Sequence, residues 1–436
     1  FTVPASVRVI YAYAFSENDS LQSLLFEEGT ADLVLGAPYN TGYSVEYGNV
    51  IYSTYSLKEL HLPARLTVIE REAFRYASDL KTVTFGSEGA PSRLTTIGEK
   101  AFYSTGLTTV TIPASVRNTA DSIAIGTEAF AFSSLTDIIF EMGGSSDTAP
   151  LTIGKDAFNG NTSLTAVVLP ARFTSFTDAD GNTIAPLGGS KLVFGSSIES
   201  IEISGNGKSE YTSYDGCVFN ADKTELIFCP RKKSGTVTIP ASVKKIAAMA
   251  FDHCENLTSI EFASGSVCEE LGEQAFSFCN SIKEIVLPDT VVSIEQNAFM
   301  SSRSLESFTI PAGLEYFNSL ILNNCEALQS LNASPNNANY MSKDGVLFSK
   351  DGKTLVYYLP TRTDTEYKVP DGTEEILASA FNSNKNLTSV TLPASMKCVG
   401  KSAFFRCTNL QSVTFAEGGT EPLVISAQSF SRTALT

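Results

Sequence analysis

The chain has 436 residues, of which 43% are hydrophobic, and a formal net charge of −16. This hydrophobic content is enough for a packed core, whereas the acidic balance disfavours nucleic acid and anionic membrane surfaces as partners. No apolar run approaches the roughly 18 residues that a membrane-spanning helix needs.

A short unit recurs along the chain, and the dipeptide Ala-Phe marks its copies. From Ala73 to Ala157 the copies are 28 residues apart, and some later steps shorten to 23. Periods of about 20 to 50 residues are typical of solenoids, in which neighbouring units bury each other's apolar side chains. The Ala-Phe pairs contain Phe15, Phe74, Phe102, Phe130, Phe158, Phe251, Phe276, Phe299, Phe381 and Phe404, and Ser429-Phe430 is a weaker copy.

Each unit begins with a short predicted strand of the pattern L-x-x-V-x-L. In residues 107–112, Val110 and Ile112 share one face of this strand, and Thr109 and Thr111 share the other. The strand ends at Pro, which lacks the N–H group, or at Phe before a Gly-bearing loop. An apolar pair then leads into the Ala-Phe segment, for which a short helical or 3-10 turn is predicted. The third position after each Phe holds small residues, as close packing between units would require.

Three segments depart from this regular unit. Residues near 31–55 are interpreted as a distorted repeat with an inserted loop. The segments near 206–235 and 336–365 resemble each other, and each is read as two strands joined by a turn, a β-hairpin beside the solenoid. The prediction is one solenoid over residues 1–436, a right-handed superhelix that is mostly β, with one parallel sheet of short strands and two β-hairpin units.

The unit L-x-x-[IV]-x-[IL]-P-x-x-[VL]-x-x-I-G-x-x-A-F-x-x-C resembles the BspA-type leucine-rich repeat. Residues 387–407 follow this pattern almost residue by residue, and the resemblance covers nearly the whole chain. It implies a leucine-rich-repeat fold, an α/β-type repeat solenoid. It also implies a secreted or cell-surface protein of bacteria or protozoa that takes part in adhesion or host-protein binding. Because the chain begins and ends inside a repeat, a leader, an anchor or further repeats are expected outside these residues.

The eight cysteines do not settle the redox compartment. Cys254, Cys279 and Cys407 occupy the small position after Phe, where other units carry Ser, Ala, Thr or Asn. Buried thiols are therefore the favoured reading. A disulfide between Cys254 and Cys279 remains an alternative, because the two residues occupy the same position of adjacent repeats.

No catalytic or metal-binding constellation is found in the sequence. His61 lies on a predicted strand and His253 in a distant turn, which leaves a Ser-His-Asp arrangement without support. His253 beside Cys254 matches no zinc-site spacing. Asp178 and Asp180 only faintly resemble a calcium loop, and a polar turn is favoured. The prediction is a protein without catalytic activity, metal or cofactor.

The outward positions of the predicted strands form the candidate binding surface. The function predicted is a non-enzymatic, cell-surface or secreted protein that adheres to a host protein or glycan through this surface. A structural spacer that displays another module is the alternative, and a hydrolase with a site at a hairpin base is a remote one. The candidate binding residues are His61, Thr84, Thr111, Thr238, Glu261, Thr309, Thr391 and Thr414.

Overall fold

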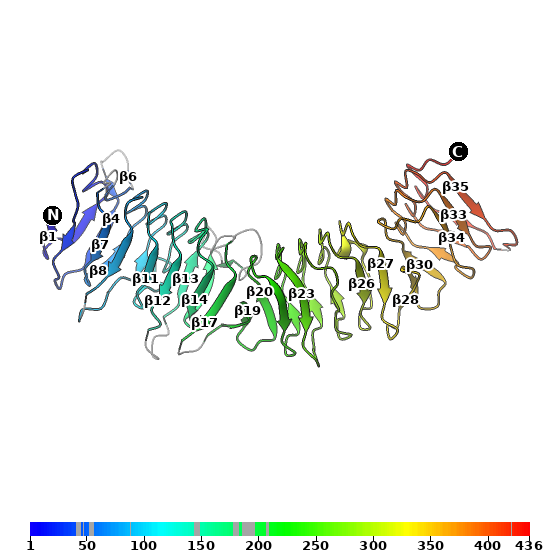
Figure 1. Ribbon diagram of the computed structural model, residues 1–436, viewed down its shortest axis with the longest axis horizontal. Coiled ribbons are helices and arrows are strands. Elements are labelled where there is room, and N and C mark those ends of the chain that lie inside the picture. Colours follow the sequence, from blue (N-terminus) through cyan, green and yellow to red (C-terminus); the bar gives the residue numbers. More distant parts are fainter. Residues whose placement is uncertain are drawn as a thin grey trace. The chain divides into compact units, whose positions relative to one another are not determined.

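The protein consists of two compact units, Phe1–Lys233 and Ser234–Thr436, in a computed structural model. Each unit is a mostly β, parallel solenoid whose short strands follow one another in chain order (Figure 1). None of the helices among the described residues is long and apolar enough to cross a membrane. The prediction that residues 1–436 form one continuous solenoid stays a prediction. The structure describes residues 1–40, 45–46, 48–51, 56–87, 89–143, 149–177, 183–184, 197–205, 209–419 and 421–436.

The L-x-x-V-x-L runs of unit 1 form a first parallel ladder. Val110 and Ile112 point inward and are buried, while Thr109 and Thr111 are exposed. Pairing keeps this register, because Thr111 lies opposite Ile139 on the next strand. Its strands are β1 (Thr2–Val3), β3 (Leu25–Phe26), β7 (Glu59–Leu62), β9 (Thr82–Phe85), β11 (Thr109–Ile112), β12 (Asp137–Phe140), β14 (Ala166–Pro170) and β17 (Ser200–Ser204).

A second parallel ladder in unit 1 comes from the apolar pairs that precede the Ala-Phe turns. Ile125 bridges Ile97 and Ile153, so that consecutive repeats pair here as well. The single predicted sheet is thus accompanied by another ladder, since these pairs are extended and in register with their neighbours. Its strands are β2 (Val9–Tyr11), β4 (Leu33–Ala37), β8 (Leu66–Ile69), β10 (Thr96–Ile97), β13 (Leu151–Gly154) and β15 (Phe173–Thr177). Short antiparallel pairs add β5 (Tyr39–Asn40) with β6 (Val45–Glu46), and β16 (Thr183–Ile184) with β15.

Unit 2 repeats the two-ladder plan. Thr391 lies between Lys368 and Thr414 in its first ladder, and Ile376 between Leu355 and Val399 in its second. The first ladder contains β21 (Gly235–Ile239), β23 (Leu257–Phe262), β26 (Ser307–Ile310), β27 (Ser330–Ala333), β31 (Glu366–Lys368), β33 (Ser389–Leu392) and β35 (Ser412–Phe415). The second contains β22 (Lys245–Ile246), β24 (Glu270–Leu271), β25 (Ser293–Ile294), β32 (Glu375–Ile376), β34 (Cys398–Val399) and β36 (Val424–Ile425).

The two segments read as hairpins each contain three antiparallel strands. The turn between the second and third strand lies where the sequence placed it, and another tight turn, at Asp215-Gly216 or Asp344-Gly345, adds a strand before it. In unit 1 the strands are β18 (Tyr211–Tyr214), β19 (Cys217–Asn220) and β20 (Glu225–Phe228). In unit 2 they are β28 (Tyr340–Lys343), β29 (Val346–Ser349) and β30 (Thr354–Tyr357).

The Ala-Phe segments are hydrogen-bonded turns, and helix is almost absent from the part of the chain that the structure describes. In the turn around Phe74, Glu72 and Tyr76 have φ of 60° and 64°, in the left-handed region that a right-handed helix cannot contain. Alternating handedness instead directs every second N–H group at the next repeat, as when the N–H of Phe74 donates to the Ala101 carbonyl oxygen at 2.7 Å. The 3-10 helix found among the described residues is η1 (Ser319–Leu322), where no Ala-Phe pair occurs.

The phenylalanines of the Ala-Phe pairs form a buried aromatic stack in each unit. The ring centroids of Phe102 and Phe130 are 5.1 Å apart at an interplanar angle of 7°, and those of Phe130 and Phe158 are 5.4 Å apart. In unit 2, Phe276 stacks in the same way on Phe251 and Phe299. The stack confirms that the Ala-Phe landmark marks the core of the repeat.

In several repeats the small residue after Phe also supplies a hydrogen-bond donor, although Ala77 occupies this position in one of them. The Ser133 hydroxyl donates to the carbonyl oxygen of Phe102 at 2.9 Å, and the Asn161 amide donates to that of Phe130 at 2.9 Å. Cys279 and Cys407 do the same in unit 2, where they donate to the carbonyl oxygens of Phe251 and Phe381 at 3.2 and 3.1 Å. Cys254 and Cys279 are both thiols and form no disulfide with each other. Packing alone, which the sequence suggested, is therefore only part of the reason for this restriction.

Candidate functional site

The outward side chains of the first ladder form an exposed row in each unit, which we call the outward face. In a strand, alternate side chains point to opposite sides, so burying the Val and Leu positions necessarily exposes the residues between them. His61, Thr84 and Thr111 of unit 1 are exposed, as are Glu261, Thr309 and Thr414 of unit 2. Thr238 and Thr391 are half-buried.

The structure brings some of these residues into direct contact. In unit 1, His61 lies opposite Thr84, and the His61 Nδ1 atom is 2.7 Å from the Thr84 hydroxyl oxygen. In unit 2, Thr238 lies opposite Glu261, and Thr391 lies opposite Thr414. Thr309 instead lies opposite Asn332, and Thr111 opposite Ile139, neither of which the sequence reading had selected.

Exposed apolar residues complete the outward face of unit 1. Strand pairing places Ile139 between Thr111 and Val168, and Val168 is paired in turn with Glu202. The side chains of Ile139 and Val168 are 54% and 36% exposed. Two neighbouring branched apolar side chains on an open sheet face leave apolar surface in water, which favours a partner that covers it.

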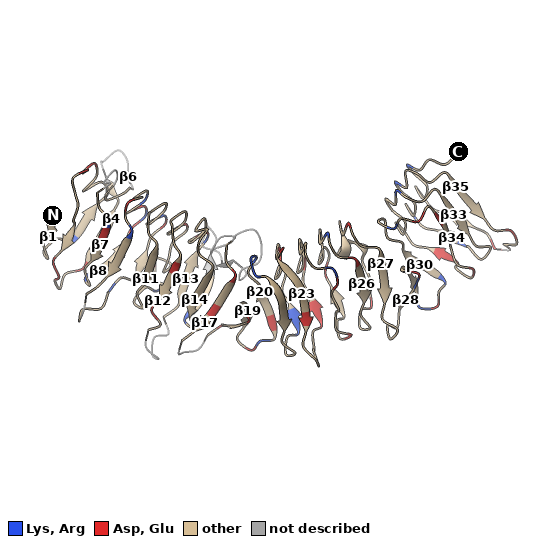
Figure 2. Ribbon diagram, in the orientation of Figure 1, with Lys and Arg blue, Asp and Glu red and all other residues tan. Residues whose placement is uncertain are grey.

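The outward face of unit 1 is also acidic. Its six strands from β7 to β17 include the exposed Glu59, Asp137 and Glu202 but no Lys or Arg (Figure 2). Each carboxylate lies on a separate strand, so the negative charge is spread along the ladder. A surface that combines dispersed carboxylates with exposed aliphatic groups is complementary to basic and apolar groups.

Beside the outward face of unit 2, residues 282–287 form no strand and expose another apolar side chain. Val286 is 72% exposed and lines a shallow surface depression together with Ser259, Glu261 and Lys283. The sequence signal for Val286 and for Ile139 was present, because both occupy the outward position of an L-x-x-V-x-L run. The preference for Thr as a typical outward residue concealed them.

The two histidines lie in different surroundings. His61 lies in unit 1 and His253 in unit 2, where its ring packs 4.2 Å from that of Phe278. Within the described ranges, no cluster of three or more His, Cys, Asp or Glu residues could hold a metal ion. Asp178 and Asp180, considered for a calcium loop, lie outside the described residues.

Comparison with known proteins identifies the repeat. Residues 46–179, 225–344 and 362–436 match the family described as BspA type leucine rich repeat region, in six copies. The crystal structure of the pneumococcal vaccine antigen PcpA is 21% identical over 90% of this chain and 83% of its own, with a TM-score of 0.50. A leucine-rich repeat protein from Eubacterium ventriosum ATCC 27560 is 21% identical over 90% of each chain, with a TM-score of 0.46.

No curated protein matches this chain. The PcpA structure, at this level of identity, bears on the fold alone. The family match covers well over half of the sequence and agrees with the two ladders and the stacked Ala-Phe turns. The chain therefore belongs to the BspA-type leucine-rich repeat family.

Proposed function

We propose that the chain is a non-enzymatic binding protein at the cell surface or in the secreted fraction. Its outward face binds a protein or glycan, and the biological role is adhesion. Membership of this repeat family suggests protein binding of this kind. Solenoids in general bind partners through their extended faces, since many shallow contacts can be made along the ladder.

The exposed apolar pair on the outward face of unit 1 is the observation that most supports this proposal. Ile139 and Val168 lie side by side on consecutive strands, with Thr111 before them and Glu202 after them. A spacer would be expected to carry polar side chains at all these positions, because exposed aliphatic groups gain nothing in water. The apolar pair favours a protein partner over a glycan.

The negative charge of the outward face indicates which groups the partner presents. Because the face carries Glu59, Asp137 and Glu202 without basic residues, we propose that the partner presents Lys or Arg around an apolar centre. Such complementarity raises the association rate more than it slows dissociation, and it weakens as salt screens the charges. Association should therefore slow between 50 and 500 mM salt, whereas dissociation should change little.

A binding screen of the intact chain tests the proposal. The chain is immobilised and exposed to purified extracellular-matrix proteins and to a glycan panel, and saturable binding is expected for at least one protein. The double variant Thr84→Lys with Thr111→Lys should weaken that binding, since it adds bulk and opposite charge to the face. Thr119→Lys, an exposed Thr in a loop of the same unit, is the matched control and should bind as the wild type does.

A structural spacer is the second candidate function. It is favoured by the regularity of the buried stack, in which Phe74, Phe102, Phe130 and Phe158 recur with nearly constant spacing. If none of the panel binds saturably, or if the face variants and the loop control behave alike, the spacer replaces adhesion as the favoured function.

A further inference from the structure

Unit 2 contains a cleft where the stacking of Ala-Phe turns is interrupted. The turn of Asn297 donates hydrogen bonds to the carbonyl oxygens of Leu320 and Ile321 in η1, as a regular repeat would. No backbone hydrogen bond joins 319–324 to 357–361, all of which are described residues. The stacking resumes only when the N–H of Tyr358 donates to the Ala380 carbonyl oxygen at 2.8 Å.

One local feature of η1 contributes to the interruption. The Asn318 side chain caps η1 by accepting a hydrogen bond from the N–H of Leu320 at 3.0 Å, so this donor is used within the turn. The two turns leave a cavity of about 380 Å³ between them.

The cleft has one apolar side and a polar rim. Leu320, Leu322 and Tyr357 supply apolar surface, while Asn323 and Asn382 supply amide groups. Glu326 is the one charged side chain among the lining residues, and it forms an ion pair with Arg303 at 3.5 Å. A cavity of this size with an apolar wall and a few polar groups has the composition of a small-molecule site.

The floor of the cleft is uncharged at physiological pH. Burial raises the pKa of Tyr357 to about 12, and burial likewise raises the pKa of the Cys325 thiol to about 12. The Tyr357 side chain is half-buried at the cleft. Its hydroxyl can donate a hydrogen bond to, or accept one from, a ligand or water in the cleft.

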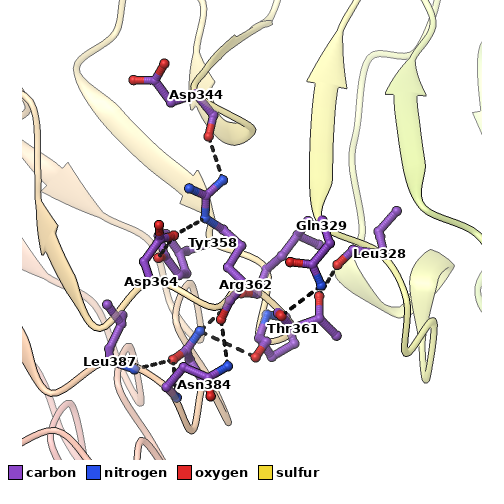
Figure 3. Close-up of polar contacts among 12 residues, drawn as sticks. Leu328, Gln329, Asp344, Tyr358, Thr361, Arg362, Asp364, Asn384 and Leu387 are labelled. Carbon is purple, nitrogen blue, oxygen red and sulfur yellow. Dashed lines mark hydrogen bonds and ion pairs between the residues drawn. The ribbon is translucent and has the colours of Figure 1, made fainter.

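The wall formed by residues 359–361, together with the residues that flank it, is held in place before any ligand arrives (Figure 3). The Thr361 hydroxyl donates to the Leu328 carbonyl oxygen, and the Gln329 amide donates to the Thr361 carbonyl oxygen at 3.0 Å. Arg362 donates to the Asp364 carboxylate at 2.7 Å, which also accepts from the Tyr358 hydroxyl at 2.7 Å. A preorganised wall lowers the entropy cost of binding a small ligand.

We propose that this cleft binds a neutral saccharide, with the C–H face of one pyranose ring against Leu320 and Tyr357 and its hydroxyls toward Asn323 and Asn382. An ion would find no opposite charge that is not already paired. A purely apolar ligand would displace water from the half-buried Asn323 and Asn382 amides, which is unfavourable. A pyranose offers both an apolar face and a rim of donors and acceptors, and about one ring fits the volume.

Saturation-transfer NMR on the full chain tests this site, with calorimetry for the affinity. The probes are the methyl glycosides of glucose, galactose, mannose and N-acetylglucosamine. A ligand of about a dozen non-hydrogen atoms should bind at about millimolar concentration. Tyr357→Phe keeps the ring but removes the hydroxyl, and it should weaken binding about tenfold. Tyr316→Phe, at a 75% exposed tyrosine outside the lining, should change nothing.

A second variant distinguishes a loss of binding from a local folding defect. Asn382→Ala removes a rim amide from a half-buried position and should also weaken binding, while the thermal melting curve stays that of the wild type. The proposal is overturned if no glycoside binds saturably, if both variants bind as the wild type does, or if a neutral dipeptide amide binds and the glycosides do not. Thr84→Lys with Thr111→Lys, on the outward face of unit 1, should leave this binding unchanged, which separates the two sites.

Discussion

The thiol of Cys279 donates a hydrogen bond to the carbonyl oxygen of Phe251 in the preceding repeat, with 3.2 Å between sulfur and oxygen. The same geometry recurs when Cys325 donates to Phe299 and when Ser302 donates to Phe276. These residues thus link each turn to the turn before it. The side chain at this position must be small enough to fit, and where it is Cys or Ser it also donates to the preceding turn.

Two substitutions of Cys279 should separate the effect of side-chain size on stability from the effect of hydrogen-bond donation. Cys279→Ser keeps a donor of similar size, as Ser133 and Ser302 show, and should cost less than about 1 kcal/mol of the free energy of unfolding. Cys279→Ala loses the donor and leaves a small cavity, which should cost about 1–2 kcal/mol. Urea unfolding of both variants measures the difference. Equal stability of the Ala variant and the wild type would show that only size matters here.

Truncation of a stacked phenylalanine should be far more costly than truncation of an exposed one. Phe130 is fully buried between Phe102 and Phe158, whereas Phe132, two residues later, is 52% exposed. Phe130→Ala should lower the free energy of unfolding by about 3–5 kcal/mol, and Phe132→Ala by less than about 1 kcal/mol. Chemical denaturation gives both values, and similar losses would contradict the account of the core.

Two substitutions at a turn residue with positive φ should change the stability of the protein in opposite directions. Ser104 has φ of 55° and donates its N–H to the Ala131 carbonyl oxygen. Ser104→Gly removes the steric cost of this conformation and should stabilise the protein by up to about 1 kcal/mol, whereas Ser104→Val should destabilise it by about 1–3 kcal/mol. Thr108→Gly, at an exposed position without positive φ, should destabilise slightly. Melting temperatures that fall for Ser104→Gly would refute this explanation of the turns.

Buried thiols should make stability depend on alkaline pH. Burial raises the pKa of Cys325 to about 12 and those of Cys268 and Cys407 to about 11. A cysteine thiol in the unfolded chain has a pKa of about 8.5. Above this pH the unfolded chain therefore releases protons that the folded chain retains. The stability that the neutral buried thiols contribute is therefore fully present below about pH 8, and it is lost as the pH rises toward 11.

Urea midpoints under reducing conditions at pH 7.5, 8.5 and 9.5 measure this dependence. We expect a flat region followed by a decline, and a smaller decline for Cys325→Ser, which carries no thiol at that position. A midpoint that rises with pH, or one that falls equally in the variant, would contradict the assignment to buried thiols.

The periodicity of the sequence determined the repeat but not all of its ladders. Ala-Phe spacing located the aromatic stack, and alternation in 107–112 gave the inward and outward positions of a strand. The second ladder was hidden, because two-residue segments such as Thr96–Ile97 are too short for a period to be recognised. The turns were read as helical, since positive φ at residues such as Lys100 has no signal in residue type.

The candidate surfaces were predictable to different degrees. Outward positions follow from the strand pattern, so Ile139 and Val286 could have been found by applying the register without regard to residue type. The cleft at Tyr357 could not, because it depends on which repeats fail to stack. Only the structure shows that η1 and the segment through Pro360 leave space between them.

Adhesion through the outward face is tested most directly by replacing the two apolar residues at its centre in unit 1 with lysine. The double variant Ile139→Lys with Val168→Lys is compared with Val292→Lys, which alters a 50% exposed valine off the first ladder, by measuring the Kd for the protein partner found in the screen. Adhesion through this face predicts at least a tenfold increase in Kd for the double variant and no change for Val292→Lys. An unchanged Kd for the double variant would contradict it.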